Sequence, residues 1–91
     1  MTQLKKILAI EDSAEIQVLI EGTLDSHVVT QAMTLAAARK HLAAATFDLI
    51  LLDIHMPDGD GLEFFEQALA NKVVPVFFLT SRKDIDRKVK A

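Results

Sequence analysis

Residues 48–53 read Asp-Leu-Ile-Leu-Leu-Asp, an unbroken apolar run between two aspartates. Turn-forming residues follow this run, namely Pro57, Asp58, Gly59 and Gly61. A short run of this kind is typical of a strand that is buried on both faces of a parallel sheet, because helices cover both faces of such a sheet. We therefore predict that residues 48–53 form the central strand of an α/β fold.

Other strands and helices are expected to alternate on both sides of this run. Short apolar segments and apolar residues at helical spacing predict strands at residues 6–10, 27–30 and 73–79, and helices at residues 16–24, 35–45 and 62–69. A further helix is expected to begin near Ile85 and Val89, which lie four positions apart among charged residues. The short connections imply right-handed crossovers, so the predicted class is a doubly wound α/β fold with a parallel sheet.

The composition narrows the class of protein. With 91 residues, of which 51% are hydrophobic and 25% charged, the chain is long enough for one small domain, which we place at residues 1–91. The absence of cysteine excludes a disulfide framework and a thiolate metal site. No stretch reaches the roughly 18 apolar residues of a membrane span, so we expect a cytoplasmic protein without a membrane partner.

Charge is distributed unevenly along the chain. The formal net charge is −3, yet five of the ten Lys and Arg residues lie within residues 82–90. Asp84 and Asp86 interrupt this basic segment, which favours a solvated helix face over a nucleic acid interface. We therefore do not expect nucleic acid as a partner.

Acidic residues stand where two of the predicted strands end. Glu11 and Asp12 follow the strand at residues 6–10, and Asp53 ends the strand at residues 48–53. In a sheet of order 2-1-3-4 these strands are neighbours, so their three carboxylates converge at the edge where ligands bind in open α/β sheets. Such a group needs a counter-ion, and hard oxygen ligands suit Mg²⁺. The alternative is that each aspartate only caps the helix that follows it.

Three motifs resemble one known family. Residues 6–13, Lys-Ile-Leu-Ala-Ile-Glu-Asp-Ser, resemble the first strand and acidic pair of a response-regulator receiver domain. Residues 52–61, Leu-Asp-Ile-His-Met-Pro-Asp-Gly-Asp-Gly, are similar to the phosphorylation loop of that family, and residues 78–81, Phe-Leu-Thr-Ser, to the end of its fourth strand. The order of the motifs over the whole chain identifies it as a member of the CheY-like receiver superfamily. The resemblance implies the flavodoxin-like receiver topology.

The resemblance also implies a role for individual residues. Asp53 is expected to accept a phosphoryl group from a sensor histidine kinase or phosphotransfer protein, without the chain being an enzyme. Asp12 and Asp53 would hold Mg²⁺ directly with the backbone carbonyl of His55, and Glu11 would act through water. Thr80 would be the hydroxyl switch residue. A role for the His55 side chain as a ligand is not favoured, because no second histidine is near in sequence.

One part of the family pattern is not found in the sequence. By spacing from Thr80, the receiver lysine of the fifth strand would lie beyond Ala91, so we expect a C-terminally truncated receiver that lacks the fifth strand and fifth helix. Phosphoryl transfer would then be impaired by the loss of one fixed cation. Residues 73–79 would form an apolar sheet edge, which predicts a homodimer through the C-terminal strand and helix region.

Two other functions compete with a phosphorylated receiver. The first is a pseudo-receiver that is not phosphorylated and acts as a dimerisation or protein-interaction module. The second is a phosphatase with an aspartate nucleophile, which requires a second acid two residues after the nucleophile. His55 occupies that position, so the phosphatase is strongly disfavoured.

Overall fold

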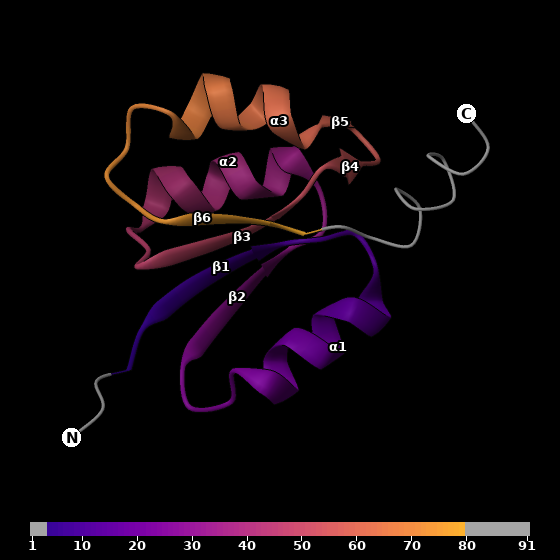
Figure 1. Ribbon diagram of the computed structural model, residues 1–91, viewed down its shortest axis with the longest axis vertical. Coiled ribbons are helices and arrows are strands. Elements are labelled where there is room, and N and C mark those ends of the chain that lie inside the picture. The colour runs from indigo at the N-terminus through magenta and orange to yellow at the C-terminus, as the bar shows by residue number, and fades with distance from the viewer. Residues whose placement is uncertain (1–3, 80–91) are drawn as a thin grey trace.

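The computed structural model describes residues 4–79 of the chain. Figure 1 shows a sheet with α1 on one face and with α2 and α3 on the other. The elements follow the chain in the order β1 (Lys6–Ile10), α1 (Ala14–Thr23), β2 (Val28–Ala32), α2 (Leu35–Ala44), β3 (Leu49–Asp53), β4 (His55–Met56), β5 (Gly59–Asp60), α3 (Gly61–Phe64), the π-helix η1 (Phe65–Leu69) and β6 (Val76–Leu79). The alternation of strands and helices confirms the predicted α/β class.

The main sheet has four parallel strands in the order β2-β1-β3-β6. This is the predicted order 2-1-3-4, with β6 as the fourth long strand. In β1, Ile7 to Ile10 are at most 2% exposed, because strands cover both of its edges and helices lie on both faces of the sheet. The apolar run at residues 49–52 pairs with β1 on one side and with β6 on the other, as its sequence predicted.

The core lies between the sheet and the helices α2, α3 and η1. Its buried aliphatic residues include Leu8 and Ile10 from β1 and Ile50 and Leu52 from β3, all of them fully buried. Burial of a side chain of this size contributes about 1.5–3 kcal/mol to folding. Residues of this one layer therefore join both central strands to the helices that follow them.

The helix after β5 differs from the sequence prediction. Helical spacing in the sequence predicts that Leu62, Phe65 and Leu69 face inward. Instead, Leu62 is 47% exposed and Phe65 is half-buried, whereas Phe64 and Leu69 are each 1% exposed. The reason is a π-helical turn, in which the Ala70 N–H donates to the Phe65 carbonyl at 2.8 Å. The wider turn brings residues five positions apart, Phe64 and Leu69, to the same face.

The last described strand is shorter than predicted. The apolar run suggested a strand over residues 73–79, but β6 begins at Val76, and Val73 is fully exposed. Pro75 lacks an N–H and contributes only its carbonyl, which accepts from the Ile50 N–H at 3.0 Å. The prediction of a helix near Ile85 and Val89 lies outside the described residues.

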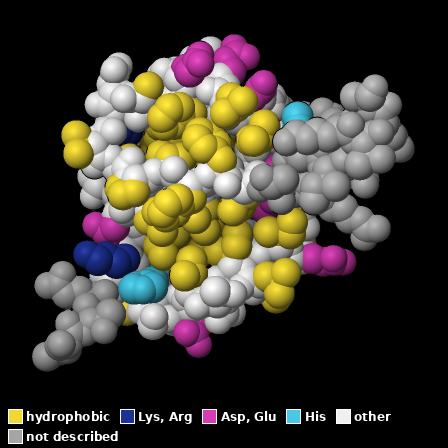
Figure 2. Space-filling view, in the orientation of Figure 1, with side chains coloured by type: hydrophobic (Ala, Val, Ile, Leu, Met, Phe, Trp, Pro, Cys, Tyr) yellow, Lys and Arg dark blue, Asp and Glu magenta, His cyan; other side chains and the backbone are white. Residues whose placement is uncertain are grey.

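Apolar side chains remain exposed near β6. Phe77 is 60% exposed and Phe78 is 40% exposed, although Phe78 packs edge-on against Phe65 with ring centroids 5.5 Å apart. The apolar run at residues 73–79 predicts core or packing positions for both rings, and this prediction is wrong for Phe77. Figure 2 shows apolar side chains gathered across the middle of the molecular face on which Figure 1 places β6. Within residues 4–79, no helix has the length and apolar character needed to cross a membrane.

A pair of glycine substitutions tests this packing. A methyl group at Gly61 would press against the Asp53 carbonyl and lie 2.9 Å from the Ile54 Cα, whereas one at Gly22 in α1 would meet nothing within 4 Å. We expect Gly61→Ala to lower the free energy of unfolding by about 1–3 kcal/mol. Gly22→Ala should raise it by about 0.5–1 kcal/mol, because alanine favours the helix. Urea unfolding measures both, and equal effects would contradict the close approach at Gly61.

Candidate functional site

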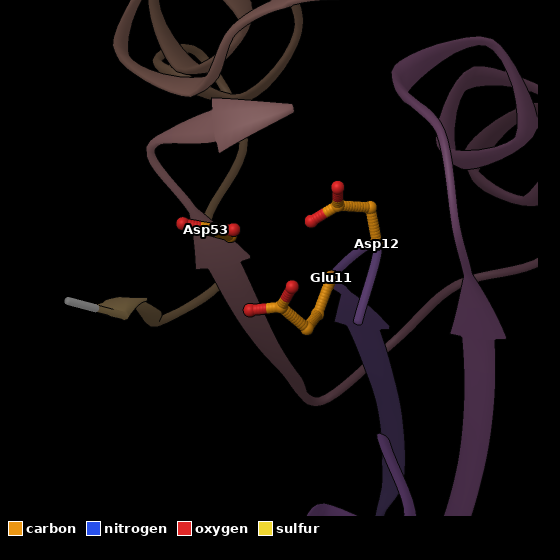
Figure 3. Close-up of side chains that lie close together, drawn as sticks. All are labelled: Glu11, Asp12 and Asp53. Carbon is orange, nitrogen blue, oxygen red and sulfur yellow. The ribbon is translucent and has the colours of Figure 1, made fainter. Parts of the chain in front are cut away.

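Three carboxylates meet at the carboxyl ends of β1 and β3. Glu11 and Asp12 follow the last residue of β1, and Asp53 is the last residue of β3. Because Ile10 pairs with Leu52, the residues that follow these two lie at neighbouring strand ends. One oxygen of each carboxylate lies within 4.8 Å of the others. Figure 3 shows the three side chains directed toward the space between the two strand ends. The structure therefore brings together the three acids that the sequence pattern placed at one edge.

The acids differ in their exposure to solvent. Glu11 and Asp53 are fully buried, and Asp12 is half-buried. The pKa of Glu11 is raised to about 7, mainly by burial. A side-chain hydrogen bond with Asp12 and the negative charges of Asp53 and Asp12 also raise this pKa, whereas the hydrogen bond from the Ser13 N–H lowers it. Near neutral pH and without a cation, the Glu11 carboxyl group is therefore protonated in part of the molecules.

Backbone N–H groups hold two of the acids, and one buried carboxylate oxygen remains for another ligand. The Ser13 N–H donates to Glu11 Oε2 at 2.8 Å, and the His55 N–H donates to Asp53 Oδ1 at 3.3 Å. Glu11 Oε1 is buried and has no hydrogen-bond partner among residues 4–79. A buried oxygen of this kind fits a cation or a cation-bound water. The site offers only oxygen ligands, a set that suits Mg²⁺.

The loop after Asp53 is held by its own backbone. His55 pairs with Asp60 and Met56 with Gly59 in the β4–β5 hairpin, so the His55 backbone is part of an ordered turn next to Asp53. The Gly61 N–H donates to the Ile54 carbonyl at 2.6 Å, which closes this turn. The resemblance assigns a ligand role to the His55 carbonyl, and this residue does adjoin the acidic group in the chain. Thr80 lies outside the described residues.

Asp58 ties the same loop to a helix. Its carboxylate accepts from the N–H groups of Leu35 and Ala36, at 2.8 and 3.0 Å, in the first turn of α2. The Leu35 hydrogen bond is the main reason that the pKa of Asp58 is lowered. The sequence suggested only a turn residue here, because a helix cap from a residue 22 or 23 positions away has no local pattern.

Gln17 is a second residue that the sequence pattern did not single out. It lies in α1, is only 1% exposed, and donates through Nε2 to the carbonyls of Ala9 at 2.9 Å and Glu11 at 3.0 Å. The only signal in the sequence is a polar residue three positions before the buried Ile20. Gln17 therefore connects α1 to the end of β1 directly beneath the acidic group.

Comparison with known proteins gives one consistent family. Residues 7–91 match the response regulator receiver domain family. The chain is 34% identical over 87 residues to the KDP operon transcriptional regulatory protein KdpE of Escherichia coli K12, a match that covers 93% of this chain and 39% of that protein. It is 37% identical over 87 residues to the transcriptional regulatory protein SpaR of Bacillus subtilis, with the same coverage of 93% and 39%.

Other relatives differ in what their names describe. A protein-glutamate methylesterase/protein-glutamine glutaminase of Agrobacterium fabrum is 33% identical over 85 residues, which are 89% of this chain and 24% of that protein. The chain thus spans less than half the length of these curated relatives.

Solved structures show the same likeness. The chemotaxis response regulator CheY4 of Vibrio cholerae has a TM-score of 0.81 at 28% identity, over 97% of this chain and 78% of that chain. The MaeR response regulator bound to beryllium trifluoride has a TM-score of 0.77 at 26% identity, over 96% of this chain and 77% of that chain.

The raised pKa of Glu11 predicts how stability depends on pH in the absence of metal. The ordinary value is 4.5 and the value in the fold is about 7, so the folded state binds this proton more tightly than the unfolded state does. The stability from this group is complete below the unfolded pKa and is lost as pH rises toward 7. A shift of this size corresponds to about 3 kcal/mol. We therefore expect Glu11→Gln to be more stable than the natural protein at pH 8, and nearly equal to it at pH 4.5.

Urea unfolding in the presence of a chelator measures this difference at the two pH values. Glu66→Gln, which changes an exposed carboxylate in η1, is the matched control and should change stability little at either pH. A Glu11→Gln variant whose advantage is the same at both pH values would contradict the raised pKa of Glu11.

Proposed function

The chain belongs to the response regulator receiver domain family, and from this membership we propose that Asp53 is the phosphoacceptor of a two-component signalling system. The observation that carries the proposal is the meeting of Glu11, Asp12 and Asp53 within 4.8 Å at the end of two paired strands. A single aspartate at a strand end has a simpler role as a helix cap. Two fully buried acids beside a half-buried third, with no hydrogen-bond partner for Glu11 Oε1 among residues 4–79, are costly unless they serve a cation.

In the proposed reaction, Asp53 attacks the phosphorus of a phosphohistidine on a sensor histidine kinase or phosphotransfer protein. The new bond joins an Asp53 oxygen to phosphorus, the nitrogen–phosphorus bond breaks, and the histidine leaves with the electron pair and takes up a proton. Asp12 and Asp53 would hold Mg²⁺, with help from the His55 carbonyl and with Glu11 acting through water. When bound, Mg²⁺ supplies the positive charge that neutralises the phosphoryl oxygens.

The residues of the chain itself contribute position. Ser13 holds the Glu11 carboxylate, and the His55 N–H holds one oxygen of Asp53, so neither acid has to be ordered when phosphate arrives. Thr80 remains the proposed switch residue. We propose no enzymatic turnover for this chain. The name of the methylesterase relative describes a whole protein, and the match covers only 24% of it.

We propose that phosphoryl transfer to these 91 residues is slow. None of these 91 residues matches the fifth-strand lysine of the family pattern, and without that fixed cation the transferring group is less stabilised. The alternative function is an interaction module that is not phosphorylated and that acts through a homodimer. Phosphorylation at Asp53 distinguishes the two.

Intact mass after treatment with acetyl phosphate and Mg²⁺ tests the phosphoacceptor. We expect a slow gain of one phosphoryl group that requires Mg²⁺ and is lost in Asp53→Asn. Asp48→Asn is the matched control, because Asp48 precedes the opposite end of β3 and hydrogen-bonds the Lys6 N–H. A gain that persists in Asp53→Asn would reject the assigned residue, and rapid complete phosphorylation would reject slow transfer.

We further propose that the chain forms a homodimer through the C-terminal strand and helix region. The supporting observation is that β6 pairs only with β3 among the described strands, so its outer backbone groups can pair with another chain. Phe77 adds a large exposed apolar side chain on this strand. Apolar patches at a sheet edge commonly become interfaces between copies.

Light scattering over a micromolar concentration range tests the dimer. We expect twice the chain mass for the natural sequence and a shift toward monomer for Phe77→Asp. Val73→Asp is the matched control, because Val73 is equally apolar and fully exposed but lies outside β6. A monomer at every concentration would reject the dimer, and an equal effect of both substitutions would reject its placement at β6.

A further inference from the structure

The buried amide of Gln17 contacts the backbone that carries Glu11, and the proposed phosphoryl transfer does not use it. Both hydrogens of its Nε2 are used, one toward the Ala9 carbonyl at 2.9 Å and one toward the Glu11 carbonyl at 3.0 Å. Its Oε1 is buried and has no hydrogen-bond partner within residues 4–79. An apolar side chain at this inward position would avoid that cost. Packing alone therefore does not account for a glutamine here.

The two carbonyls that Gln17 contacts lie at the point where β1 gives way to the site. Ala9 is inside β1, and Glu11 is the first residue after it. The Glu11 carbonyl and the Asp12 N–H belong to one planar peptide unit, so fixing the carbonyl also fixes the direction in which the Asp12 backbone continues. Gln17 thus acts on the backbone that carries both acids of β1.

A second contact fixes the side chain at the same point. The Ser13 N–H holds Glu11 Oε2 at 2.8 Å, and Ser13 Oγ accepts from the Ile16 N–H at the start of α1. The side chain of Glu11 and the backbone around it are therefore both held by residues of the α1 N-terminal region. Rotation of the peptide after Glu11 would redirect the Asp12 side chain, and the hydrogen bond from Gln17 Nε2 to the Glu11 carbonyl opposes that rotation.

We infer that Gln17 is a positioning residue of the cation site, which holds the Glu11–Asp12 peptide so that both acids face Asp53. The inference rests on the proposed function, since it assigns Gln17 a purpose in binding Mg²⁺. Partners behind a metal ligand commonly change metal affinity about 10- to 100-fold when they are removed. Gln17 acts through the backbone of its neighbours and does not touch the cation.

Gln17→Met tests this role, because methionine is similar in length to glutamine and lacks both donors. Amide chemical shifts followed during a titration with MgCl₂ should show Mg²⁺ binding about 10-fold weaker than in the natural protein. Ile20→Val is the matched control, since Ile20 is also a buried residue of α1 and its aliphatic side chain donates no hydrogen bond. The control should lower the melting temperature without changing Mg²⁺ affinity. Equal Mg²⁺ affinity in Gln17→Met and the natural protein, or equal weakening in both variants, would overturn the inference.

Two metal-free readouts separate this inference from the proposed function. Without Mg²⁺, the Asp12 amide resonance should move in Gln17→Met, because the Glu11 carbonyl loses its hydrogen bond; an unmoved resonance overturns the inference. In the natural protein, the Gln17 side-chain amide protons should exchange slowly with solvent, which needs no variant that folds. Rapid exchange overturns the inference as well. The absence of Mg²⁺-dependent shifts in the natural protein would overturn the proposed function instead. The Asp12 and Gln17 measurements would then still show whether Gln17 holds the Glu11 carbonyl.

Discussion

The parallel pairing of β1 with β3 is the constraint on which the rest of the structure depends. Both strands are flanked on two edges by other strands and on two faces by helices, so Ile7 to Ile10 in β1 and Ile50 and Leu52 in β3 are removed from water, while Leu49 and Leu51 are partly buried. Pairing in the same direction brings their carboxyl ends to one edge. Glu11, Asp12 and Asp53 are next to each other because Ile10 lies beside Leu52. The burial that stabilises the sheet therefore also creates the repulsion of the site.

That repulsion is opposed by hydrogen bonds and close contacts on both sides of the site. On the β1 side, Ser13 and Gln17 hold the side chain and the backbone of Glu11. On the β3 side, the β4–β5 hairpin and the close approach of Gly61 to the Asp53 carbonyl hold the loop. Asp58 then joins this loop to α2. Stability lost where the acids meet is offset by packing and hydrogen bonds around them, an arrangement common to sites that bind a charged ligand.

Part of the surface is apolar, in contrast to the acidic site. The core between the sheet and α2 is closed, whereas the side chain of Phe77 on β6 remains mostly in water. The curated relatives contain the matched segment within longer proteins with different names, among them transcriptional regulators and a methylesterase. Receiver chemistry is thus compatible with several outputs, and residues outside the acidic group are where such differences arise.

The sequence by itself determined the α/β class and the three acids, because each depends on a local pattern, and the resemblance to receiver domains supplied the sheet order. An apolar run marks a buried strand, and an acid at its end marks the edge of the sheet, so Asp53 could be placed before any geometry was known. The resemblance added the roles of these acids. Only the tertiary structure decided that Phe64 and not Leu62 faces the core, because a π-helical turn changes the spacing of the inward residues. It also decided the caps from Asp58 and the buried amide of Gln17, since hydrogen bonds between distant segments leave no periodic trace in the chain. The raised pKa of Glu11 has the same origin: burial is a property of the packed molecule and not of the residue.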